Sequence, residues 1–218
     1  MYQYLFFDLD GTLTDPREGI TKSVQHALAR MGIDEPDLTK LEPFIGPPLI
    51  DSFMEYYGFS MEQARQGVDY YREYFRVKGL YQNRLFDGVP KLLAFLKENG
   101  KVLAIASSKP EPFVREILEM FRVDGYFDYI CGSTLDEKRT KKEEVIEELL
   151  ARMNLPEAER KKVLMIGDRR HDVEGAAVFG IPCLGLSMGF AAPGELEEAG
   201  AVAVVDSMEA IGQFVCQE

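Results

Sequence analysis

The sequence predicts an α/β protein whose core is a mostly parallel sheet with helices on both faces, interrupted by one helical insertion. Two observations lead to this prediction. Short apolar runs rich in Val, Ile and aromatic residues alternate with segments whose apolar residues recur at helical spacing. One long segment, residues 16–84, breaks the alternation and shows helical patterns without a convincing core strand.

Six apolar runs have the length and composition of buried strands. They are YQYLFF (2–7), KVLAIAS (101–107), YFDYIC (126–131), KVLMIGD (162–168), IPCLGLS (181–187) and AVAVVD (201–206). The segments between them have helical periodicity; Leu92, Leu93 and Leu96, for example, share one face of a helix. Strands that alternate with helices in this way form parallel sheets.

The segment that breaks the alternation is bounded by turn-forming residues, at Asp15-Pro16 and at residues 83–88. Within it, residues 61–80 form a helical stretch rich in Tyr and Phe. We therefore expect two domains, a core made of residues 1–15 and 85–218 and a helical cap made of residues 16–84.

Composition narrows the class of protein. The 218 residues include 25 Lys and Arg against 37 Asp and Glu, a net charge of -12, which argues against nucleic acid and anionic membranes as partners. Cys131, Cys183 and Cys216 are widely spaced without a CxxC pair, as is typical of a reducing compartment, and we expect the first two to be buried. Without a signal peptide or a long apolar segment, the chain is expected to be cytoplasmic.

Two aspartates, Asp8 and Asp10, follow the first apolar run. Residues two apart in a strand point to the same side, so both carboxylates are expected to face one pocket at the carboxyl edge of the sheet, where open α/β sheets bind ligands. A turn at Asp10-Gly11 would explain Asp10 alone and would leave Asp8 without a partner. The pair therefore indicates a functional site.

A second acidic pair, Asp168 and Asp172, follows the run at 162–168. Helix capping is the alternative for Asp168, because a helix dipole favours an anion at its N-terminal end. Hard oxygen ligands from two strands make a magnesium site, and the cation would offset the repulsion between neighbouring carboxylates. We expect Mg²⁺ at this site, bound also to the phosphate oxygens of a substrate.

Two other strand ends supply hydroxyls and cations. Ser107, Ser108 and Lys109 close the run KVLAIASSK, where hydroxyls and backbone N–H groups suit phosphate oxygens. A cluster of four basic residues precedes a later helix, and one lysine of that cluster would serve as a counter-charge to phosphate. The cluster consists of Lys138, Arg139, Lys141 and Lys142. Together these groups predict a phosphoryl group as the ligand.

At this point the sequence resembles the haloacid dehalogenase superfamily of phosphatases. The stretch from Asp8 to Thr14 matches its DxDGTLx signature, Ser107 its second-motif hydroxyl, and Gly167 to Asp172 its GDxxxD motif. The motifs occur in the right order over the whole chain. The helical insertion after the first motif resembles the cap of the phosphoglycolate phosphatase-like branch, and the resemblance implies a Rossmann-like core.

The resemblance also implies roles for the aspartates. Asp8 would attack phosphorus to give an aspartyl-phosphate, and Asp10 would protonate the leaving alcohol and then activate water. The residues alone leave open which aspartate attacks. Magnesium would be held by Asp8, the main-chain carbonyl of Asp10 and Asp168, with Asp172 in support.

The expected phosphate ligands are Ser107 and Ser108, Thr12 and one lysine. The chain lacks the common Lys-Pro-x-Pro form of the third motif, so the motif leaves the lysine open. Counting back from the helix favours Lys142. The alternatives are Lys141 and Lys138.

Other functions share parts of this pattern. A haloacid dehalogenase proper needs neither Asp10 nor the Asp168 ligand, and a phospho-aspartate receiver, a switch, is shorter and lacks a helical insertion. A β-phosphoglucomutase-like phosphosugar mutase uses the same two aspartates and differs in how water is excluded. We predict hydrolysis of a small phosphorylated metabolite, as in phosphoglycolate phosphatases or 5′-nucleotidases. Phosphoglycolate, a nucleoside monophosphate, pyrophosphate and a sugar phosphate all fit, as do a monomer and a homodimer.

Overall fold

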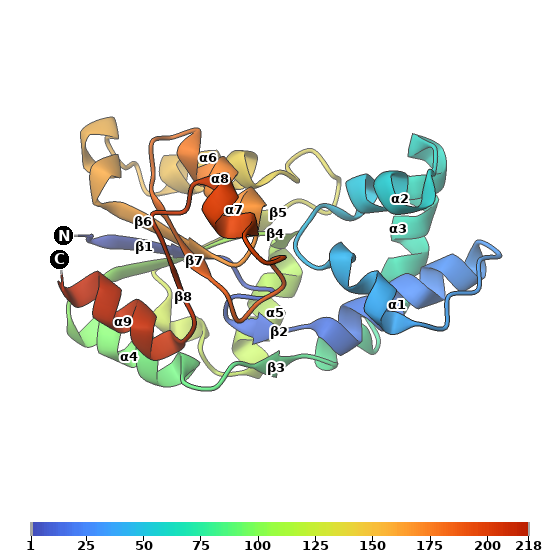
Figure 1. Cartoon of the computed structure of the whole chain (residues 1–218), viewed down its shortest axis with the longest axis horizontal. Coiled ribbons are helices and arrows are strands. Elements are labelled where there is room, and N and C mark those ends of the chain that lie inside the picture. Colours follow the sequence, from blue (N-terminus) through green and yellow to red (C-terminus); the bar gives the residue numbers. More distant parts are fainter. Residues whose placement is uncertain (1, 218) are drawn as a thin grey trace. The chain divides into compact units, whose positions relative to one another are not determined.

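The computed structural model describes residues 2–217 and contains a six-stranded sheet (Figure 1). The strands lie in the order β5-β4-β1-β6-β7-β8, and every neighbouring pair is parallel. The strands are β1 (Tyr4–Phe7), β4 (Val102–Pro110), β5 (Tyr129–Ser133), β6 (Val163–Gly167), β7 (Cys183–Leu186) and β8 (Ala203–Val205). The predicted α/β fold with a parallel sheet is confirmed. Each strand overlaps one of the six apolar runs, although β4 continues beyond its run to Pro110 and β5 continues to Ser133.

The central strand β1 shows why these runs are continuously apolar. Phe7 lies beside Ile105 of β4 on one side and Ile166 of β6 on the other. Phe6 and Phe7 are both fully buried although they point to opposite faces of the sheet. A parallel sheet covered on both faces buries every position of its inner strands, which removes the polar alternation.

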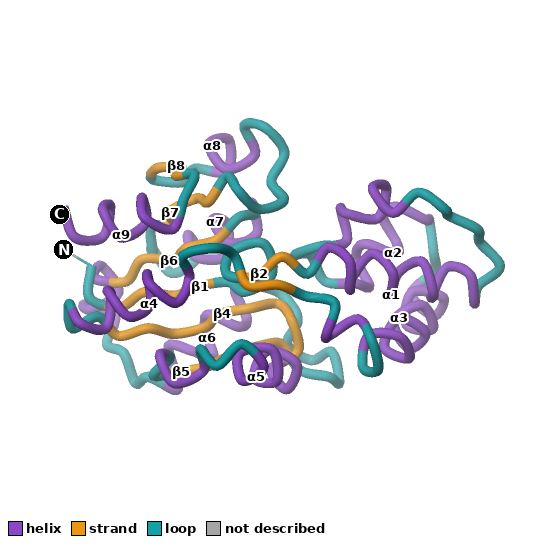
Figure 2. The backbone as a smooth tube through the Cα atoms, turned by 90° about the horizontal axis from the view of Figure 1, so that it is seen from below, coloured by secondary structure: helices purple, strands orange, loops and turns teal. Residues whose placement is uncertain are grey.

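Helices cover both faces of this sheet (Figures 1 and 2). On one face α6, α7 and α8 enclose a core that includes Phe6, Ala104 and Met165. On the other face lie α4, α5 and α9, with α4 packed against α9. The helices are α4 (Val89–Glu98), α5 (Glu111–Met120), α6 (Lys142–Arg152), α7 (Arg170–Ala177), α8 (Glu195–Ala199) and α9 (Met208–Gln217).

The chain divides into two compact units, one made of the residues up to Thr14 and from Leu85 onward, the other of Asp15–Arg84. The expected boundary lay one residue later, after Asp15. The second unit is helical, with α1 and α2 packed on α3. Its helices are α1 (Arg17–Arg30), α2 (Leu49–Tyr57) and α3 (Met61–Phe75), and the short strands β2 (Thr14–Asp15) and β3 (Arg84–Leu85) form a separate two-stranded sheet.

Two expectations from composition can be compared with the structure. Cys131 and Cys183 are buried, as predicted, whereas Cys216 is exposed, and all three thiols are free. Within residues 2–217, no helix has both the length and the apolar character needed to cross a membrane.

The strand order places a site at the carboxyl ends of the central strands. From β1 the chain adds β4 and β5 on one side, then crosses to add β6, β7 and β8 on the other. Such a reversal opens a crevice at the carboxyl edge. Asp8 follows β1 at this edge, Ser107 lies near the end of β4, and Asp168 follows β6.

Candidate active site

Asp8 is held at the end of β1 by main-chain and side-chain contacts. Its N–H donates to the carbonyl of Ile166 at 3.0 Å, and Lys142 Nζ donates to Asp8 Oδ1 at 2.8 Å. The same Nζ lies 2.8 Å from Asp172 Oδ1 and donates to the carbonyl of Ala106 at 2.8 Å. Burial lowers the pKa of Lys142, but the carboxylates of Asp172 and Asp8 outweigh it, so the pKa is raised. Lys142 is therefore a fixed cation between two carboxylates.

Of the three lysines considered from the sequence, Lys142 is the one placed at Asp8. Lys138 is exposed and pairs with Asp136 at 2.9 Å, and Lys141 is exposed at the start of α6. The approach of α7 to α6 depends on Gly175, where a Cβ would lie 2.8 Å from Lys142 Cβ and Cγ. A larger residue at this position would push the lysine-bearing helix away.

Asp10 lies at the same edge and is paired with a different lysine. Lys109 Nζ donates to Asp10 Oδ2 at 2.5 Å, and both side chains are buried. Among the described residues, nothing forms a hydrogen bond with Asp10 Oδ1, which is also buried. Burial raises the pKa of Asp10, and Lys109 opposes this only in part. A carboxyl group with a raised pKa is suited to carry and pass on a proton.

The second acidic pair lies at the end of β6. Asp168 is fully buried and accepts hydrogen bonds from two uncharged donors, the hydroxyl of Thr12 at 3.1 Å and the N–H of Phe190 at 2.8 Å. Asp172, the third residue of α7, accepts the N–H of the N-cap residue Arg169 at 3.1 Å. Asp168 therefore does not cap this helix, which was the alternative interpretation of its position. Burial and neighbouring carboxylates raise the pKa of Asp168 well above its usual value, and burial raises that of Asp172 to about 6.

Three of these carboxylates lie close to one another. Asp8, Asp168 and Asp172 each offer an oxygen within 4.8 Å of the other two. Lys142 supplies one positive charge to this group, which leaves negative charge in excess. Carboxylate oxygens are the ligands that Mg²⁺ prefers, and a bound divalent cation would remove the excess charge. The donor set therefore fits magnesium.

Two glycines let the main chain approach Asp168. Gly11 has a φ of +88°, and a Cβ there would lie 2.1 Å from Asp168 Oδ2. A Cβ on Gly189, in the loop after β7, would lie 2.3 Å from the same oxygen. Gly11 thus meets a conformational and a steric requirement together.

The three hydroxyl-bearing residues predicted to bind phosphate differ in burial and in hydrogen bonding. Ser107 is buried, and its Oγ accepts the N–H of Lys109 at 3.3 Å. Ser108 is half-buried. Thr12 directs its hydroxyl to Asp168, so it orients a carboxylate in this arrangement. The structure brings the four aspartates, Ser107 and Lys142 to the edge expected from sequence.

Sequence reasoning missed three contributors to the site. The sequence indicates Lys109 only as part of a strand end that suits phosphate oxygens, not as a partner of Asp10, and it gives no indication of Gly189 or of the N–H of Phe190. The sequence contains one indication that Lys109 has an unusual position. Pro110, the next residue, lacks an N–H and marks an irregular end of the strand. Gly189 and Phe190 carry no such signal, because only the folded loop brings them to Asp168.

Residues 5–186 match the family model of haloacid dehalogenase-like hydrolases. The chain belongs to this family. The resemblance drawn from the motifs is thereby confirmed, and the chain is a hydrolase. It is 55% identical over 195 residues to a 5′-nucleotidase of Pseudomonas aeruginosa, covering 89% of this chain and 87% of the relative.

Two further similarities concern sequence and fold. The hydrolase is 39% identical over 189 residues to a tyrosine-protein kinase of Mycobacterium tuberculosis, covering 86% of this chain but only 63% of the kinase. The solved structure of a predicted phosphatase from Clostridium acetobutylicum is 44% identical, with both chains covered at 100% and a TM-score of 0.96.

Proposed function

We propose that this hydrolase is a magnesium-dependent phosphatase that cleaves a small phosphate monoester through an aspartyl-phosphate on Asp8. The observation that carries the proposal is the convergence of Asp8, Asp168 and Asp172 within 4.8 Å, with Lys142 between two of them. Such a site suits a divalent cation and a phosphate dianion together. The relatives named 5′-nucleotidase and predicted phosphatase support phosphate esters as substrates.

Asp8 is the proposed nucleophile. Lys142 Nζ donates to its Oδ1 at 2.8 Å, which fixes the position of the carboxylate and places an ammonium group beside the reacting centre. Attack on phosphorus forms a bond from Asp8 to phosphorus while the bond from phosphorus to the alcohol oxygen breaks. Lys142, Ser107, Ser108 and the turn at Thr12 are the proposed holders of the phosphoryl oxygens.

Asp10 is the proposed acid and base. It gives its proton to the alcohol oxygen as that oxygen leaves phosphorus, and the alcohol departs. It then takes a proton from the water that attacks the phosphorus of phosphorylated Asp8, which releases inorganic phosphate and restores both carboxyl groups. The raised pKa of Asp10 supports this assignment, because the first step starts with the carboxyl protonated.

Magnesium would be held by Asp8, Asp168 and the main-chain carbonyl of Asp10, with Asp172 in support. Its positive charge would allow a carboxylate and a phosphate dianion to approach each other. The protein contributes the rigidity of the site: Thr12 and Phe190 bind the two oxygens of Asp168 from two different loops.

Residues 15–84 are the proposed cap, which would exclude water and select the substrate. Gly46-Pro47-Pro48, a stiff connection into α2, is the proposed substrate-facing loop of that cap. We further propose a cytoplasmic protein, either a monomer or a homodimer. A nucleoside 5′-monophosphate is the first substrate to try, because a 5′-nucleotidase is 55% identical.

The second candidate is transfer of the phosphoryl group to an acceptor other than water, as in a mutase. The similarity to a tyrosine-protein kinase favours this candidate. Both candidates form the aspartyl-phosphate and differ in what receives the group afterwards.

The test is phosphate release from a panel of phosphorylated metabolites, with Mg²⁺ and with EDTA. We expect release from one or a few compounds with Mg²⁺ only, and none from Asp8→Asn. Asp124→Asn, which alters an exposed aspartate, should keep full activity. Undiminished release from Asp8→Asn would overturn the mechanism, whereas a phosphorylated Asp8 without release would indicate a transferase or a switch.

A further inference from the structure

The active edge contains a second buried lysine that the proposed mechanism does not use. Lys109 and Asp10 are each less than one tenth exposed, and Lys109 Nζ binds Asp10 Oδ2. The other oxygen, Oδ1, is buried without a hydrogen-bond partner in the part of the chain that the structure describes. A buried ion pair often adds little stability over an apolar pair of similar volume. The pair therefore calls for a reason other than stability.

An irregularity in β4 places Lys109 at Asp10. Ser107 of β4 lies opposite Gly132 of β5, but the next matched pair is Pro110 with Ser133. Two residues of β4, Ser108 and Lys109, therefore lie between adjacent positions of β5. Such bulges redirect side chains and are frequent beside active sites.

Gly132 accommodates the irregular segment. A Cβ at Gly132 would lie 2.6 Å from the carbonyl oxygen of Lys109 and 2.6 Å from the N and Cα of Glu111. The absence of a side chain thus allows the main chain around Lys109 to pack directly on β5. The carbonyl of Gly132 is bound in turn by Nε and Nη2 of Arg139, each at 3.1 Å.

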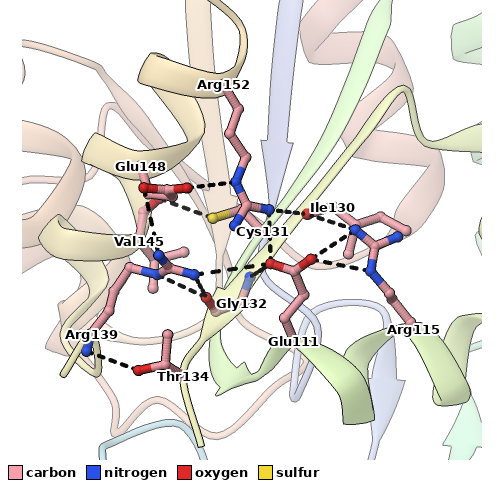
Figure 3. Close-up of polar contacts among 10 residues, drawn as sticks. All are labelled: Glu111, Arg115, Ile130, Cys131, Gly132, Thr134, Arg139, Val145, Glu148 and Arg152. Carbon is pink, nitrogen blue, oxygen red and sulfur yellow. Dashed lines mark hydrogen bonds and ion pairs between the residues drawn. The ribbon is translucent and has the colours of Figure 1, made fainter. Parts of the chain in front are cut away.

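A network of hydrogen bonds and ion pairs fixes the residue that follows the bulge, Glu111 (Figure 3). Glu111, the residue after Pro110, accepts hydrogen bonds from Arg115 and from Arg152, each at 2.8 Å. Figure 3 shows the carboxylate of Glu111 between these two guanidinium groups and facing Gly132. The bulge is therefore held on both sides by groups that do not themselves reach Asp10.

We propose that Lys109 is a positioning residue that holds one oxygen of Asp10 and leaves the other free to exchange a proton with the reacting oxygen. The proposal rests on the proposed function. The torsion angle that orients an aspartate carboxyl group is broad, so Asp10 would otherwise sample several orientations. Asp10 must serve first the leaving alcohol and then water, and a fixed Oδ2 keeps Oδ1 directed at the same place in both steps.

The test compares two substrates whose leaving groups differ in their need for a proton. A nucleoside 5′-monophosphate releases a basic alkoxide, whereas 4-nitrophenyl phosphate releases a phenolate that leaves unprotonated. We expect Lys109→Met to lower kcat/KM for the nucleotide by about 10²-fold or more and that for the aryl ester by only a few-fold. A burst of 4-nitrophenol should appear, because hydrolysis of the aspartyl-phosphate also needs Asp10 and becomes slow.

A role in phosphate binding or in folding would lower kcat/KM equally for both esters without a burst, and that result would overturn the proposal. In an Asp10→Asn background, Lys109→Met should cause no further loss on the nucleotide, since it acts through the missing carboxyl. An additional loss of the same size would also overturn it. If Lys109→Met does not fold, Lys109→Gln is measured against the same outcomes.

Lys101→Met is the matched control. Lys101 is a buried lysine at the opposite end of β4, where its Nζ donates to the carbonyl of Tyr2 at 2.6 Å. This variant should leave the ratio of the two kcat/KM values unchanged. If the unaltered protein hydrolyses neither ester with Mg²⁺, the proposed function fails and this inference falls with it. If the unaltered protein is active and the ratio does not change in Lys109→Met, only this inference fails.

Discussion

The two edges of the six-stranded sheet differ in how their charged side chains are paired. At the amino edge, the buried Lys101 donates to the carbonyl of Tyr2, and the exposed Asp128 pairs with Lys97 at 2.7 Å and accepts the N–H of Leu103 at 2.9 Å. Each charge there has its own partner. At the carboxyl edge, the buried charged residues are Asp8, Asp10, Asp168, Asp172, Lys109 and Lys142.

The difference is one of balance, because four carboxylates face two ammonium groups at the carboxyl edge. Burial raises the pKa of Asp168 well above its usual value, and the neighbouring carboxylates of Asp172 and Asp8 add to this effect. Such an arrangement costs stability in the metal-free protein. An unbalanced edge therefore indicates a place where a ligand supplies the missing charge, and a balanced edge indicates structure alone.

The largest effect is expected from the lysine at the centre of the unbalanced edge. Lys142→Met should reduce kcat by about 10²- to 10³-fold, because a preorganised positive charge beside the phosphoryl group is lost. It should also lower the free energy of unfolding by roughly 3 kcal/mol, since Asp8 and Asp172 lose their shared cation. Steady-state kinetics and urea denaturation measure the two quantities.

Lys101→Met is the counterpart at the balanced edge. It should cost about 1 to 3 kcal/mol of stability, because the carbonyl of Tyr2 loses its donor, and it should leave kcat unchanged. A loss of kcat as large as that of Lys142→Met would contradict the proposal that only the carboxyl edge takes part in catalysis.

Metal binding tests whether a cation completes the carboxyl edge. We expect Mg²⁺ to stabilise the unaltered protein by about 2.7 kcal/mol at a concentration of 100 times its Kd, visible as a rise in Tm. Asp168→Asn should abolish most of that rise while the metal-free Tm stays equal or increases, because one buried carboxylate is removed. Asp128→Asn at the amino edge should keep the rise, and its loss there would contradict the assignment.

The smallest expected change in stability is at Glu111, which forms ion pairs with two arginines beside the bulge in β4. Burial raises the pKa of Glu111, but hydrogen bonds from Arg115 and Arg152 outweigh it, so the pKa lies below its ordinary value of 4.5. A lowered carboxyl pKa stabilises the fold above pH 4.5, and this contribution is lost as the pH falls through the folded-state pKa.

Glu111→Gln should therefore cost about 1 kcal/mol at neutral pH, and the difference in Tm from the unaltered protein should shrink as the medium is acidified. Thermal melts at several pH values measure this. A difference that stays constant down to the most acidic condition would show that the charge of Glu111 is not the stabilising feature.

Local patterns were sufficient for much of this site. The apolar run before Asp8 predicts a strand, the spacing of Asp8 and Asp10 predicts that both lie at its carboxyl end, and the run before Asp168 does the same for β6. Each of these inferences uses only a short stretch of chain. Because the carboxyl ends of parallel strands lie at the same edge of a sheet, the two acidic pairs can be placed at one edge before the strand order is known.

Contacts between distant segments were not predictable in this way. The salt bridge from Lys109 to Asp10 depends on a shift of register between β4 and β5, and the sequence of β4 alone does not show its partner's register. The hydroxyl of Thr12, expected at phosphate, binds Asp168 because the turn after β1 packs against the end of β6.

The sequence by itself determined the fold class, the six strands and the acidic character of the site, because hydrophobic periodicity and the motif residues are local properties. Only the tertiary structure decided which lysine serves which aspartate and where the charge is left unbalanced. The physical reason is that the pairing of buried charges depends on distances of a few ångströms between side chains far apart in the chain, and packing alone sets those distances.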